Sequence, residues 1–398
     1  MRILVISHNH HYLRDGVPVG REPIIKEINW LARPVDQLIH LACLHPGTAG
    51  EGYMPYVENV EFIGLPPAGG LKLREKLSIL GRGVQYSKAI LQQLPQADFI
   101  HVRVPGNLGM YGMILTSLVS KKPRWYKYAG NFMEVNGSSP SLVFQHSWLQ
   151  HGFGRGPVMV NGRWPSQPKY LHSFINPSFS IAETQQAAAA ARQKTIAAPI
   201  RIVYAGRLEK GKGADKAVEI LQLVLETQEA LLDIFGTGPL QDSLAERCSA
   251  AGLQERVFFH GWQSQQEVHR SLAQSHFTLL PSDSEGWPKI LSEGMIYGSV
   301  PIASQVSSIP QIFADFSTGI AIPPANIHGF ASAITGLAQR PEKWREMSLA
   351  GLAAAPYFSY ENYLICLEEM FLQTYQQSPF NQAIMNAVHQ DFQAARSL

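Results

Sequence analysis

Cysteine is scarce in this chain of 398 residues, which contains three: Cys43, Cys248 and Cys366. They are odd in number and lie far apart in the sequence, so they predict neither a disulfide framework nor a cysteine-rich metal site. Disulfides belong mainly to oxidising compartments, whereas cytoplasmic proteins keep their thiols reduced. We therefore expect a cytoplasmic protein.

Charged residues and long apolar runs are also few. Charged side chains make up 16% of the sequence and the formal net charge is +2, which gives no electrostatic basis for nucleic acid binding or an acidic tail. No segment approaches the roughly 18 uninterrupted apolar residues of a membrane-spanning helix. The start, MRILVISHNHHYLRDG, has too short an apolar run for a signal peptide and predicts a buried strand. At most, we expect the protein to associate peripherally with the inner face of the membrane.

Hydrophobic content, in contrast, is 45%, and the chain is long enough that two domains are expected. Strand-like and helical segments alternate twice along it, as in parallel α/β sheets. In the first half, helices are expected around Lys72–Leu94 and Leu108–Val119, and strands at Arg2–Ser7, Leu38–Leu44, Phe99–Val104 and Arg124–Gly130. A tract at 136–156, rich in glycine, serine and aromatic residues, predicts loops and one short helix before VMVNG and YLHSFIN resume strand character.

The alternation restarts in the second half. Strands are expected there at 200–206, 231–236, 256–261, 277–281 and 300–304. The preceding alanine- and glutamine-rich tract, 182–199, has the composition of a partly helical linker. We therefore expect a first domain at 1–185, a linker at 186–199 and a second domain at 200–375. Near the end, Tyr357–Gln377 has helical spacing that predicts a structural helix in preference to a partner-binding or membrane-binding surface.

Glycines and cations follow two of the second-half strands. In YAGRLEKGKGAD, Gly206 lets the backbone turn, and Arg207 and Lys212 place two cations that either cradle a phosphate or belong to a solvated turn. In IFGTGPL, Gly236 and Gly238 permit either close approach by a ligand or a tight turn. Ligands of doubly wound sheets bind outside the carboxyl ends of the strands, where these loops would gather.

The stretch PSDSEGWPKILSEGM places two acids around a predicted helix start. Proline is favoured at the first helical position, so the helix is expected to begin near Pro288. Glu285 then lies on the preceding loop, and Glu293 lies about a turn and a half inside the helix. The structural alternative for Glu285 is an acidic cap favoured by the helix dipole.

These motifs follow one another in a fixed order: AGRLEKGKGAD, IFGTGPL, VFFHGW, SEGWPKILSEGM and GSVPIASQVSSIPQI. In this order and at these intervals they resemble the retaining glycosyltransferases of family 4 (glycosyl transferases group 1), which have the GT-B fold. The resemblance is strong over Ile200 to Pro324 and covers the first half only in strand layout. It implies two Rossmann-like doubly wound α/β domains facing across a cleft, with a C-terminal tail, 376–398, that packs on or near the first domain.

The resemblance also implies roles for individual residues. Glu285 would bind hydroxyls of the donor sugar, and Glu293 would hold the ribose of the nucleotide. Backbone N–H groups at the helix start would join the basic pair on the donor diphosphate, although Pro288 has none to give. The implied catalytic residues are Arg207, Lys212 and Glu285, and the implied donor-binding residues are Gly206, Phe235, Gly236, Gly238, His260, Gly261, Trp287, Pro288, Lys289, Ile290 and Glu293.

The sequence lacks any pair of aspartates separated by a single residue, so the Asp-x-Asp metal motif of other sugar transferases is absent. We expect no metal and no cofactor, with the departing diphosphate neutralised by Arg207, Lys212 and the helix N-terminus. The resemblance implies transfer from a UDP- or GDP-sugar to a hydroxyl of a glycan, lipid-linked sugar or small molecule. Configuration would be retained by front-face displacement, in the synthesis of a polysaccharide, glycolipid or other glycoconjugate. Hydrolysis by paired carboxylates fits less well, because Glu293 is assigned to the ribose.

The acceptor side departs from the family pattern. Where a Gly-Gly loop is usual, the chain reads DGVPVGR, so Gly16, Gly20 and Arg21 are expected to stand in. Where a cleft histidine is usual, it reads KYAGNF, which leaves Asn131 or the backbone at Gly130.

Histidines crowd the loop expected after the first strand, at His8, His10 and His11. They either line the cleft, bind zinc or are simply solvated. Arg103 is expected either at the cleft mouth or in an internal salt bridge. The acceptor-side candidates are therefore His10, Gly16, Gly20, Arg21, Arg103 and Asn131.

Two other classes of protein can be distinguished from a glycosyltransferase. A nicotinamide-dependent dehydrogenase would share the alternation, but HNHHYL stands where a Gly-x-Gly-x-x-Gly would be required. A catalytically inactive nucleotide-sugar-binding or scaffold protein of GT-B fold would bind the donor without turning it over. Within the motif, Trp287 either flanks the donor sugar or packs beneath its loop.

Overall fold

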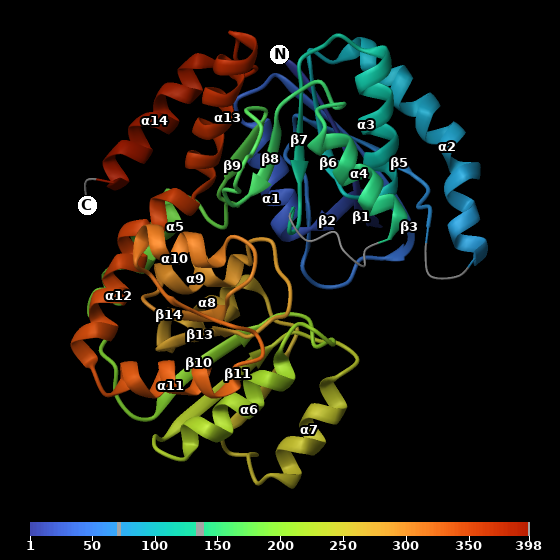
Figure 1. The fold of residues 1–398 in the computed structure, drawn as a ribbon. Coiled ribbons are helices and arrows are strands. Elements are labelled where there is room, and N and C mark those ends of the chain that lie inside the picture. The colour runs from blue at the N-terminus through green and yellow to red at the C-terminus, as the bar shows by residue number, and fades with distance from the viewer. Residues whose placement is uncertain (70–72, 133–138, 397–398) are drawn as a thin grey trace. The chain divides into compact units, whose positions relative to one another are not determined.

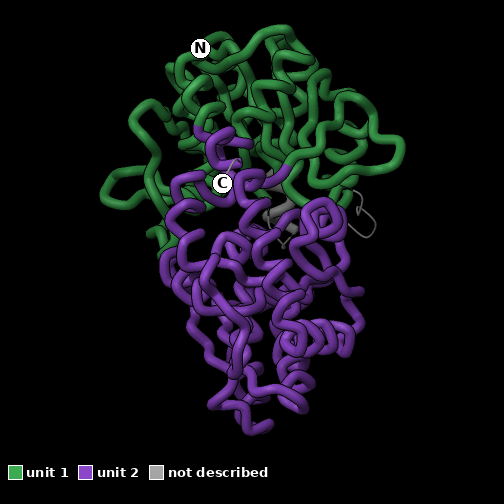
Figure 2. The backbone as a smooth tube through the Cα atoms, turned by 90° about the vertical axis from the view of Figure 1, so that its left-hand side faces the viewer, with its two compact units in different colours: residues 1–174, 363–390 green, residues 175–362, 391–398 purple. Residues whose placement is uncertain are grey.

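The computed structural model describes residues 1–69, 73–132 and 139–396, and helices alternate with strands along most of the chain (Figure 1). The chain divides into two compact units (Figure 2). The first comprises Met1–Phe174 and Tyr363–Gln390, and the second comprises Ile175–Asn362 and Asp391–Leu398.

The first unit is built on a nine-stranded sheet. Its parallel part has the order β5-β3-β1-β6-β7-β8-β9, and β2 and β4 extend it by antiparallel pairing at the end of β1. The strands are β1 (Arg2–Arg14), β2 (Val17–Arg21), β3 (Gln37–Thr48), β4 (Tyr53–Pro55), β5 (Val60–Leu65), β6 (Phe99–Val104), β7 (Arg124–Tyr128), β8 (Val158–Asn161) and β9 (Leu171–Phe174). The helices are α1 (Glu22–Ala32), α2 (Leu73–Gln93), α3 (Asn107–Val119) and α4 (Pro140–Gln150), with a short 3-10 turn at Leu94–Gln96.

The second unit holds a six-stranded parallel sheet of order β12-β11-β10-β13-β14-β15. Its strands are β10 (Ile200–Ala205), β11 (Ala230–Phe235), β12 (Val257–Gly261), β13 (Phe277–Leu280), β14 (Val300–Ser304) and β15 (Ile320–Ile322). Its helices are α5 (Ile181–Ala191), α6 (Ala214–Leu225), α7 (Gln241–Ala250), α8 (Gln265–Gln274), α9 (Lys289–Ile296), α10 (Ile309–Phe316), α11 (Ile327–Ala338) and α12 (Pro341–Ala354), followed by a 3-10 turn at Ala355–Phe358. The strand order reverses between β10 and β13, so this sheet is doubly wound.

Apolar runs explain why the central strands form where they do. Ile3 to Ile6 in β1 are fully buried, and so are alternate or consecutive residues of β6, β10 and β13. Strands of a parallel sheet that is covered on both faces read as near-continuous hydrophobic segments. The sequence-predicted strands and the α2, α3 and α9 helices are therefore confirmed in position to within a few residues. Of the predicted loop and helix tract at 136–156, residues 136–138 lie outside the described residues and the helix is α4.

The first strand is longer than predicted. The sequence placed His8, His10 and His11 in a loop, but β1 continues to Arg14 and pairs with β2 there. The loop interpretation is wrong because His10 and His11 pair with β3 and His11 also pairs with β2, which strand-like hydrophobicity alone does not reveal. Strands β2, β4, β5 and β15 and helix α1 were not predicted.

The tract expected as a linker is mostly a packed helix. Ser180 and Glu183 form a capping box at the start of α5, and one face of this alanine-rich helix is buried in the second unit. Alanine has the highest helix propensity, and capping satisfies the first N–H groups. The division between units falls after Phe174, and the chain re-enters the first unit at Tyr363 rather than at 376.

Two helices complete the chain, α13 (Tyr360–Tyr375) and α14 (Gln382–Arg396). In the first unit, Phe371 of α13 packs edge-on against Phe99 of β6 and Trp125 of β7, with ring centroids 5.6 and 4.9 Å apart. The Tyr375 hydroxyl donates a 2.6 Å hydrogen bond to the Arg124 carbonyl. The predicted C-terminal helix is therefore structural, and it is an integral part of the first unit.

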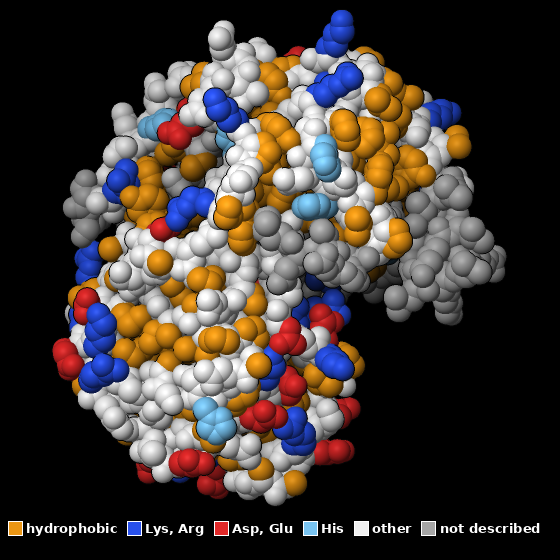
Figure 3. Space-filling model, in the orientation of Figure 1, with side chains coloured by type: hydrophobic (Ala, Val, Ile, Leu, Met, Phe, Trp, Pro, Cys, Tyr) orange, Lys and Arg blue, Asp and Glu red, His pale blue; other side chains and the backbone are white. Residues whose placement is uncertain are grey.

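Surface character differs over the face seen in Figure 3. Apolar side chains gather over α3 and α4 of the first unit, where Leu118, Val119, Val143 and Phe144 are exposed (Figure 3). Over the second unit, acidic and basic side chains are interspersed. None of the described helices has the length and apolar character that crossing a membrane requires.

Candidate functional site

The loops that follow β10 and β13 lie side by side in the second unit. The Asp283 N–H donates to the Gly211 carbonyl over 2.8 Å, and the Ser282 hydroxyl donates to the Lys212 carbonyl over 3.0 Å. The Tyr204 hydroxyl, at the end of β10, also donates to the Lys212 carbonyl over 3.0 Å. These contacts fix the two loops at the point where the strand order reverses, which is where doubly wound sheets bind their ligands.

Two of the three predicted catalytic residues meet across these loops. Lys212 Nζ lies 2.9 Å from Glu285 Oε1, and the two side chains are 34% and 15% exposed. The Lys212 side chain keeps access to solvent, so a bound anion would meet an ammonium group that is already positioned. The pair was not predicted, although both members were.

Arg207, the third predicted catalytic residue, pairs with a different carboxylate. Its guanidinium is 65% exposed and forms an ion pair with Glu209 at 2.9 Å on the same loop. Exposed ion pairs of this kind contribute little to stability. The Arg207 side chain is therefore held only weakly in the position seen here.

The glycine prediction at the end of β11 is explained by close backbone packing. Gly236 has a φ of 122° and donates its N–H to the Gly261 carbonyl over 2.7 Å. A Cβ on Gly236 would lie 1.9 Å from the Gly206 carbonyl oxygen, and one on Gly238 would lie 2.4 Å from the Leu208 carbonyl oxygen. These glycines let the loops after β10 and β11 approach each other.

Gly236→Ala is expected to destabilise the second unit by about 2 to 3 kcal/mol, because both the positive φ and the carbonyl collision must be relieved. Gly261→Ala is the matched control: its φ is 66°, but a Cβ there would meet nothing within 4 Å. It should lose only about 1 kcal/mol. Urea unfolding of both variants measures the difference. Equal losses would show that the contact with Gly206 is unimportant.

Aromatic side chains follow β11 and β12. The rings of Phe235 and His260 stack with centroids 4.4 Å apart, and His260 Nε2 lies 2.7 Å from Asp233 Oδ1. Phe235 is buried, whereas His260 is partly exposed. Asp233 therefore fixes the orientation of the imidazole that lies over Phe235.

The start of α9 differs slightly from the prediction. Pro288 is the N-cap residue and the helix begins at Lys289, with Ile290 buried behind it. Trp287 is buried at 4% exposure and its ring stacks on Phe358 at 5.2 Å, so it packs beneath the loop. The alternative in which the indole flanks a ligand is not the one seen. Lys289 Nζ lies 5.6 Å from the centre of the Tyr360 ring.

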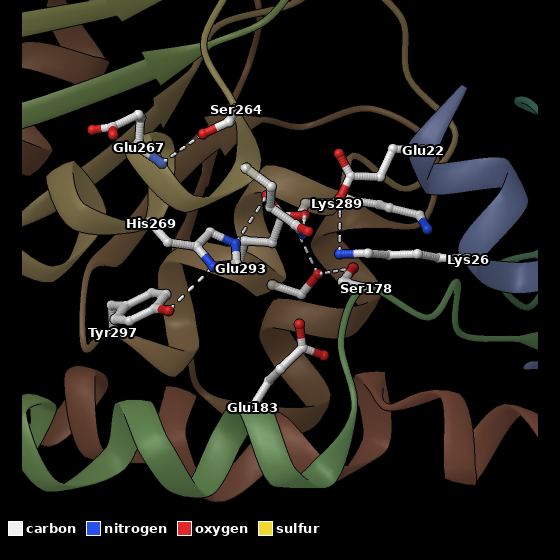
Figure 4. Close-up of polar contacts among 12 residues, drawn as sticks. Glu22, Lys26, Ser178, Glu183, Ser264, Glu267, His269, Lys289, Glu293 and Tyr297 are labelled. Carbon is white, nitrogen blue, oxygen red and sulfur yellow. Dashed lines mark hydrogen bonds and ion pairs between the residues drawn. The ribbon is translucent and has the colours of Figure 1, made fainter. Parts of the chain in front are cut away.

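Glu293 lies inside α9 with partners that sequence reasoning missed. Gln265 Nε2 donates to Glu293 Oε1 over 3.1 Å, and His269 Nε2 lies 3.9 Å from Glu293 Oε2. The Tyr297 hydroxyl lies 3.1 Å from His269 Nδ1 (Figure 4). The four-residue spacing of Gln265 and His269 was the available signal, because it puts both on one face of a helix.

In the first unit, the candidate Arg103 is in an internal salt bridge. Arg103 Nη1 and Lys127 Nζ lie 2.5 and 2.7 Å from the same oxygen, Glu27 Oε1. All three side chains are nearly buried, and the Lys127 ammonium also lies 4.7 Å from the Phe174 ring centre. The alternative of a guanidinium at an open cleft mouth is not the one seen.

The glycines expected to replace the Gly-Gly loop have other positions. Gly16, with a φ of 79°, follows Asp15 in the turn of the β1–β2 hairpin, and Gly20 lies within β2. A Cβ on Gly20 would lie 2.7 Å from the His11 ring, so glycine is needed there for packing. Arg21 is the exposed N-cap residue of α1. A single glycine-rich loop therefore does not form here, because the segment folds as a hairpin.

Asn131 lies just after the carboxyl end of β7, and His10 lies in the second half of β1. Asn131 lies two residues before the undescribed residues 133–138. His10 is exposed on β1, and its ring lies 4.1 Å from that of His45. Both are placed at the edge where ligands of such sheets bind. Within the described residues, no three His, Cys, Asp or Glu side chains are placed to hold a metal ion.

The buried histidines of β1 and β3 form an ordered hydrogen-bond chain. His11 Nδ1 faces the carbonyls of Asn9 and Cys43 at 3.1 and 3.3 Å, so it must carry the proton. His11 Nε2 then accepts from the Tyr56 hydroxyl (2.6 Å), whose oxygen accepts from His40 Nδ1 (2.7 Å). The Ser7 hydroxyl completes the chain by donating to His40 Nε2 over 2.8 Å.

These contacts require neutral imidazoles. Burial lowers the pKa of His11 to about 4 and lowers that of His40 well below its ordinary value. Burial, together with His10 and His45, lowers the pKa of His8 to about 4. His8 and His11 are thus neutral at pH 7, and their burial rules out simple solvation for them.

The second unit resembles known glycosyltransferases in sequence. Residues 188–351 match the model of the family described as Glycosyl transferases group 1. Alpha-D-kanosaminyltransferase of Streptomyces kanamyceticus is 28% identical over 159 residues, covering 39% of this chain and 41% of the relative. The amylovoran biosynthesis glycosyltransferase AmsK of Erwinia amylovora is 30% identical over 149 residues, covering 35% and 36%. The match thus spans about two fifths of these relatives.

Solved structures resemble the chain over nearly its full length. Sucrose-phosphate synthase from Thermosynechococcus elongatus has a TM-score of 0.71 at 14% identity, covering 94% of this chain and 99% of that chain. HepE of Anabaena, in complex with UDP, has a TM-score of 0.66 at 15% identity, covering 98% and 100%. WaaG, a glycosyltransferase involved in lipopolysaccharide biosynthesis, has a TM-score of 0.59 at 14% identity, covering 91% and 98%. The predicted GT-B fold is confirmed by these likenesses.

Proposed function

We propose that this protein is a retaining glycosyltransferase of family 4 that transfers a sugar from a nucleotide diphosphate sugar to an acceptor hydroxyl without a metal ion. The observation that carries the proposal is the ion pair of Lys212 and Glu285, which joins the loops after β10 and β13 where the strand order reverses. An ammonium group beside a carboxylate suits a ligand that has both phosphates and hydroxyls.

The comparisons support this class of reaction. The matched family region, 188–351, includes both loops and the helices that follow them. The named relatives transfer sugars, and HepE is described with UDP, with UDP and glucose, and with UDP-glucose. We extend a UDP- or GDP-sugar donor and a glycan, lipid-linked or small hydroxyl acceptor to this chain. Its setting would be the biosynthesis of a polysaccharide, glycolipid or other glycoconjugate.

The donor diphosphate is assigned to Lys212, Arg207 and the backbone N–H groups at the start of α9. Arg207 can leave Glu209 at little cost, because that ion pair is exposed. Negative charge grows on the leaving diphosphate in the transition state, and cations placed beforehand stabilise it most effectively. Glu285 is assigned to the hydroxyls of the transferred sugar.

The nucleoside is assigned to the neighbouring strand ends. Glu293 would accept hydrogen bonds from the ribose hydroxyls, while the Phe235–His260 stack and Gly261 would border the base. Gly236 and Gly238 let the loops after β10 and β11 pack closely beside this position. Peripheral membrane contact belongs to the same proposal, and the exposed apolar side chains over α3 and α4 are where to look for it.

Glu293→Ala is expected to weaken nucleotide binding by a factor on the order of 10 to 100, because hydrogen bonds to a charged group are lost. Calorimetry against UDP, GDP and their sugars should find one nucleotide that binds the parent protein. Glu219→Ala, which removes an exposed carboxylate elsewhere in this unit, is the control. An unchanged affinity in the Glu293 variant would refute the ribose contact, and binding of no nucleotide would contradict the proposed function.

The product distinguishes the proposal from its rivals. Proton NMR of the new glycosidic bond should show the anomeric configuration of the donor. An inverted product would contradict the retaining mechanism. Donor binding without transfer to any acceptor would favour the inactive binding or scaffold protein.

A further inference from the structure

Two side chains of a single helix face the carboxylate of Glu293, one through a hydrogen bond and the other at the longer distance of an ion pair. Gln265 Nε2 donates to Oε1 over 3.1 Å, and His269 Nε2 lies 3.9 Å from Oε2. Gln265 and His269 are one helical turn apart on α8, so they present side chains on the same face. The Glu293 side chain is only 13% exposed, which limits its freedom further.

The orientation of His269 follows from its second contact. The Tyr297 hydroxyl lies 3.1 Å from His269 Nδ1, and the two rings are 5.1 Å apart. If Tyr297 donates to Nδ1, the other nitrogen carries the proton and points it toward the Glu293 carboxylate. The opposite tautomer would aim a lone pair at a negative charge, which is repulsive. Tyr297, at the end of α9, therefore favours the tautomer of His269 whose Nε2 proton faces the Glu293 carboxylate, 3.9 Å away.

Helix α8 also begins directly behind the loop that follows β12. Ser264 caps it by accepting the Glu267 N–H over 3.3 Å, and His260 and Gly261 lie a few residues earlier. The loop beside the Phe235–His260 stack and the two side chains that hold Glu293 thus belong to one continuous segment. A shift of α8 would move both together.

We infer that Gln265 and His269 are positioning residues, which orient the Glu293 carboxylate toward the two vicinal hydroxyls of a ribose. The preference for a ribonucleotide over its dideoxy analogue then depends on helix α8. This inference rests on the proposed function, since it takes Glu293 as the ribose contact. A carboxylate oriented beforehand accepts two hydroxyl hydrogen bonds without the cost of ordering a flexible side chain. Neither residue needs to touch the nucleotide.

The test compares two ligands that differ only in the ribose. Kd is measured by calorimetry for UDP and for 2′,3′-dideoxy-UDP, with the GDP pair run in parallel. Gln265→Leu and His269→Asn should each weaken binding of the ribonucleotide on the order of 10-fold and leave the dideoxy analogue nearly unaffected. His269→Gln should restore most of the affinity, because its amide reaches the position of Nε2, whereas Asn reaches only that of Nδ1.

Gln266→Leu is the matched control, because Gln266 is the exposed neighbour on the same helix. It should bind both ligands as the parent does. Equal losses for the two ligands in the Gln265 and His269 variants would overturn the inference, because a merely structural role weakens both alike. If Glu293→Ala weakens binding but the Gln265 and His269 variants do not, the inference is wrong and the ribose contact stands. If Glu293→Ala also leaves binding unchanged, both the ribose contact and the inference are wrong.

Discussion

Replacing Lys212 with alanine is expected to lower turnover by a factor on the order of 100 or more, as the loss of one preorganised transition-state donor does in other enzymes. Lys212 lies where the strand order reverses, with its ammonium 2.9 Å from Glu285 Oε1. Its removal withdraws positive charge from the leaving diphosphate and also leaves Glu285 without its partner. Both effects raise the barrier more than they weaken ground-state binding, so kcat should fall more than KM rises.

Lys210→Ala is the control for this experiment, because Lys210 is an exposed lysine on the same loop. It should retain the turnover of the parent. Arg207→Ala tests the other cation and is also expected to lower turnover on the order of 100-fold, although the exposed Arg207 side chain is paired with Glu209 here. Parent-like turnover in either variant would remove that cation from the mechanism.

Acidification is expected to destabilise the first unit strongly between pH 6.5 and 4. The pKa values of His8 and His11 are lowered to about 4, chiefly by burial, whereas an unfolded histidine has a pKa near its ordinary value of 6.5. In this window the unfolded chain binds more protons, so stability rises with pH. The stabilising contribution of each neutral imidazole is complete above about pH 6.5 and is lost as the pH falls to about 4.

The size of this loss follows from the pKa shift. A shift of this size corresponds to about 3 kcal/mol for each imidazole. Urea unfolding at several pH values between 7 and 4, followed through the first unit by amide exchange of residues 2–14, measures the slope. His8→Asn and His11→Gln should each flatten it, even if they are less stable at pH 7. A slope unchanged in both variants would contradict the assignment.

Much of the fold was predictable because parallel strands buried on both faces have continuous apolar sequences. RILVIS and FIHVRV carry this signal, and the structure has strands there. The continuation of β1 to Arg14 carries no such signal, because its buried His11 is accommodated by a hydrogen bond from Tyr56, which lies 45 residues away. The return of Tyr363–Gln390 to the first unit is likewise a long-range pairing that local composition does not encode.

The site shows the same division. Lys212, Glu285 and Gly236 could be named as candidates because their motifs follow strand ends and resemble those of a known family, and sheet topology brings strand ends together. The packing of Trp287 on Phe358 and the contact of Gln265 with Glu293 depend instead on how neighbouring elements are rotated against each other. A single sequence does not specify that rotation, so these contacts could be recognised only in the three-dimensional structure.

The discontinuity of the first unit has a consequence for how the chain is made. Its sheet strands are all synthesised by Phe174, yet the Phe371 ring that packs on Phe99 and Trp125 emerges almost two hundred residues later. The intervening unit is contiguous enough to fold meanwhile, since domains generally fold as units during synthesis. On the ribosome, the strands of the first unit are therefore expected to keep an uncovered apolar surface until Tyr363–Gln390 is made, whereas Ile175–Asn362 of the second unit is made without interruption.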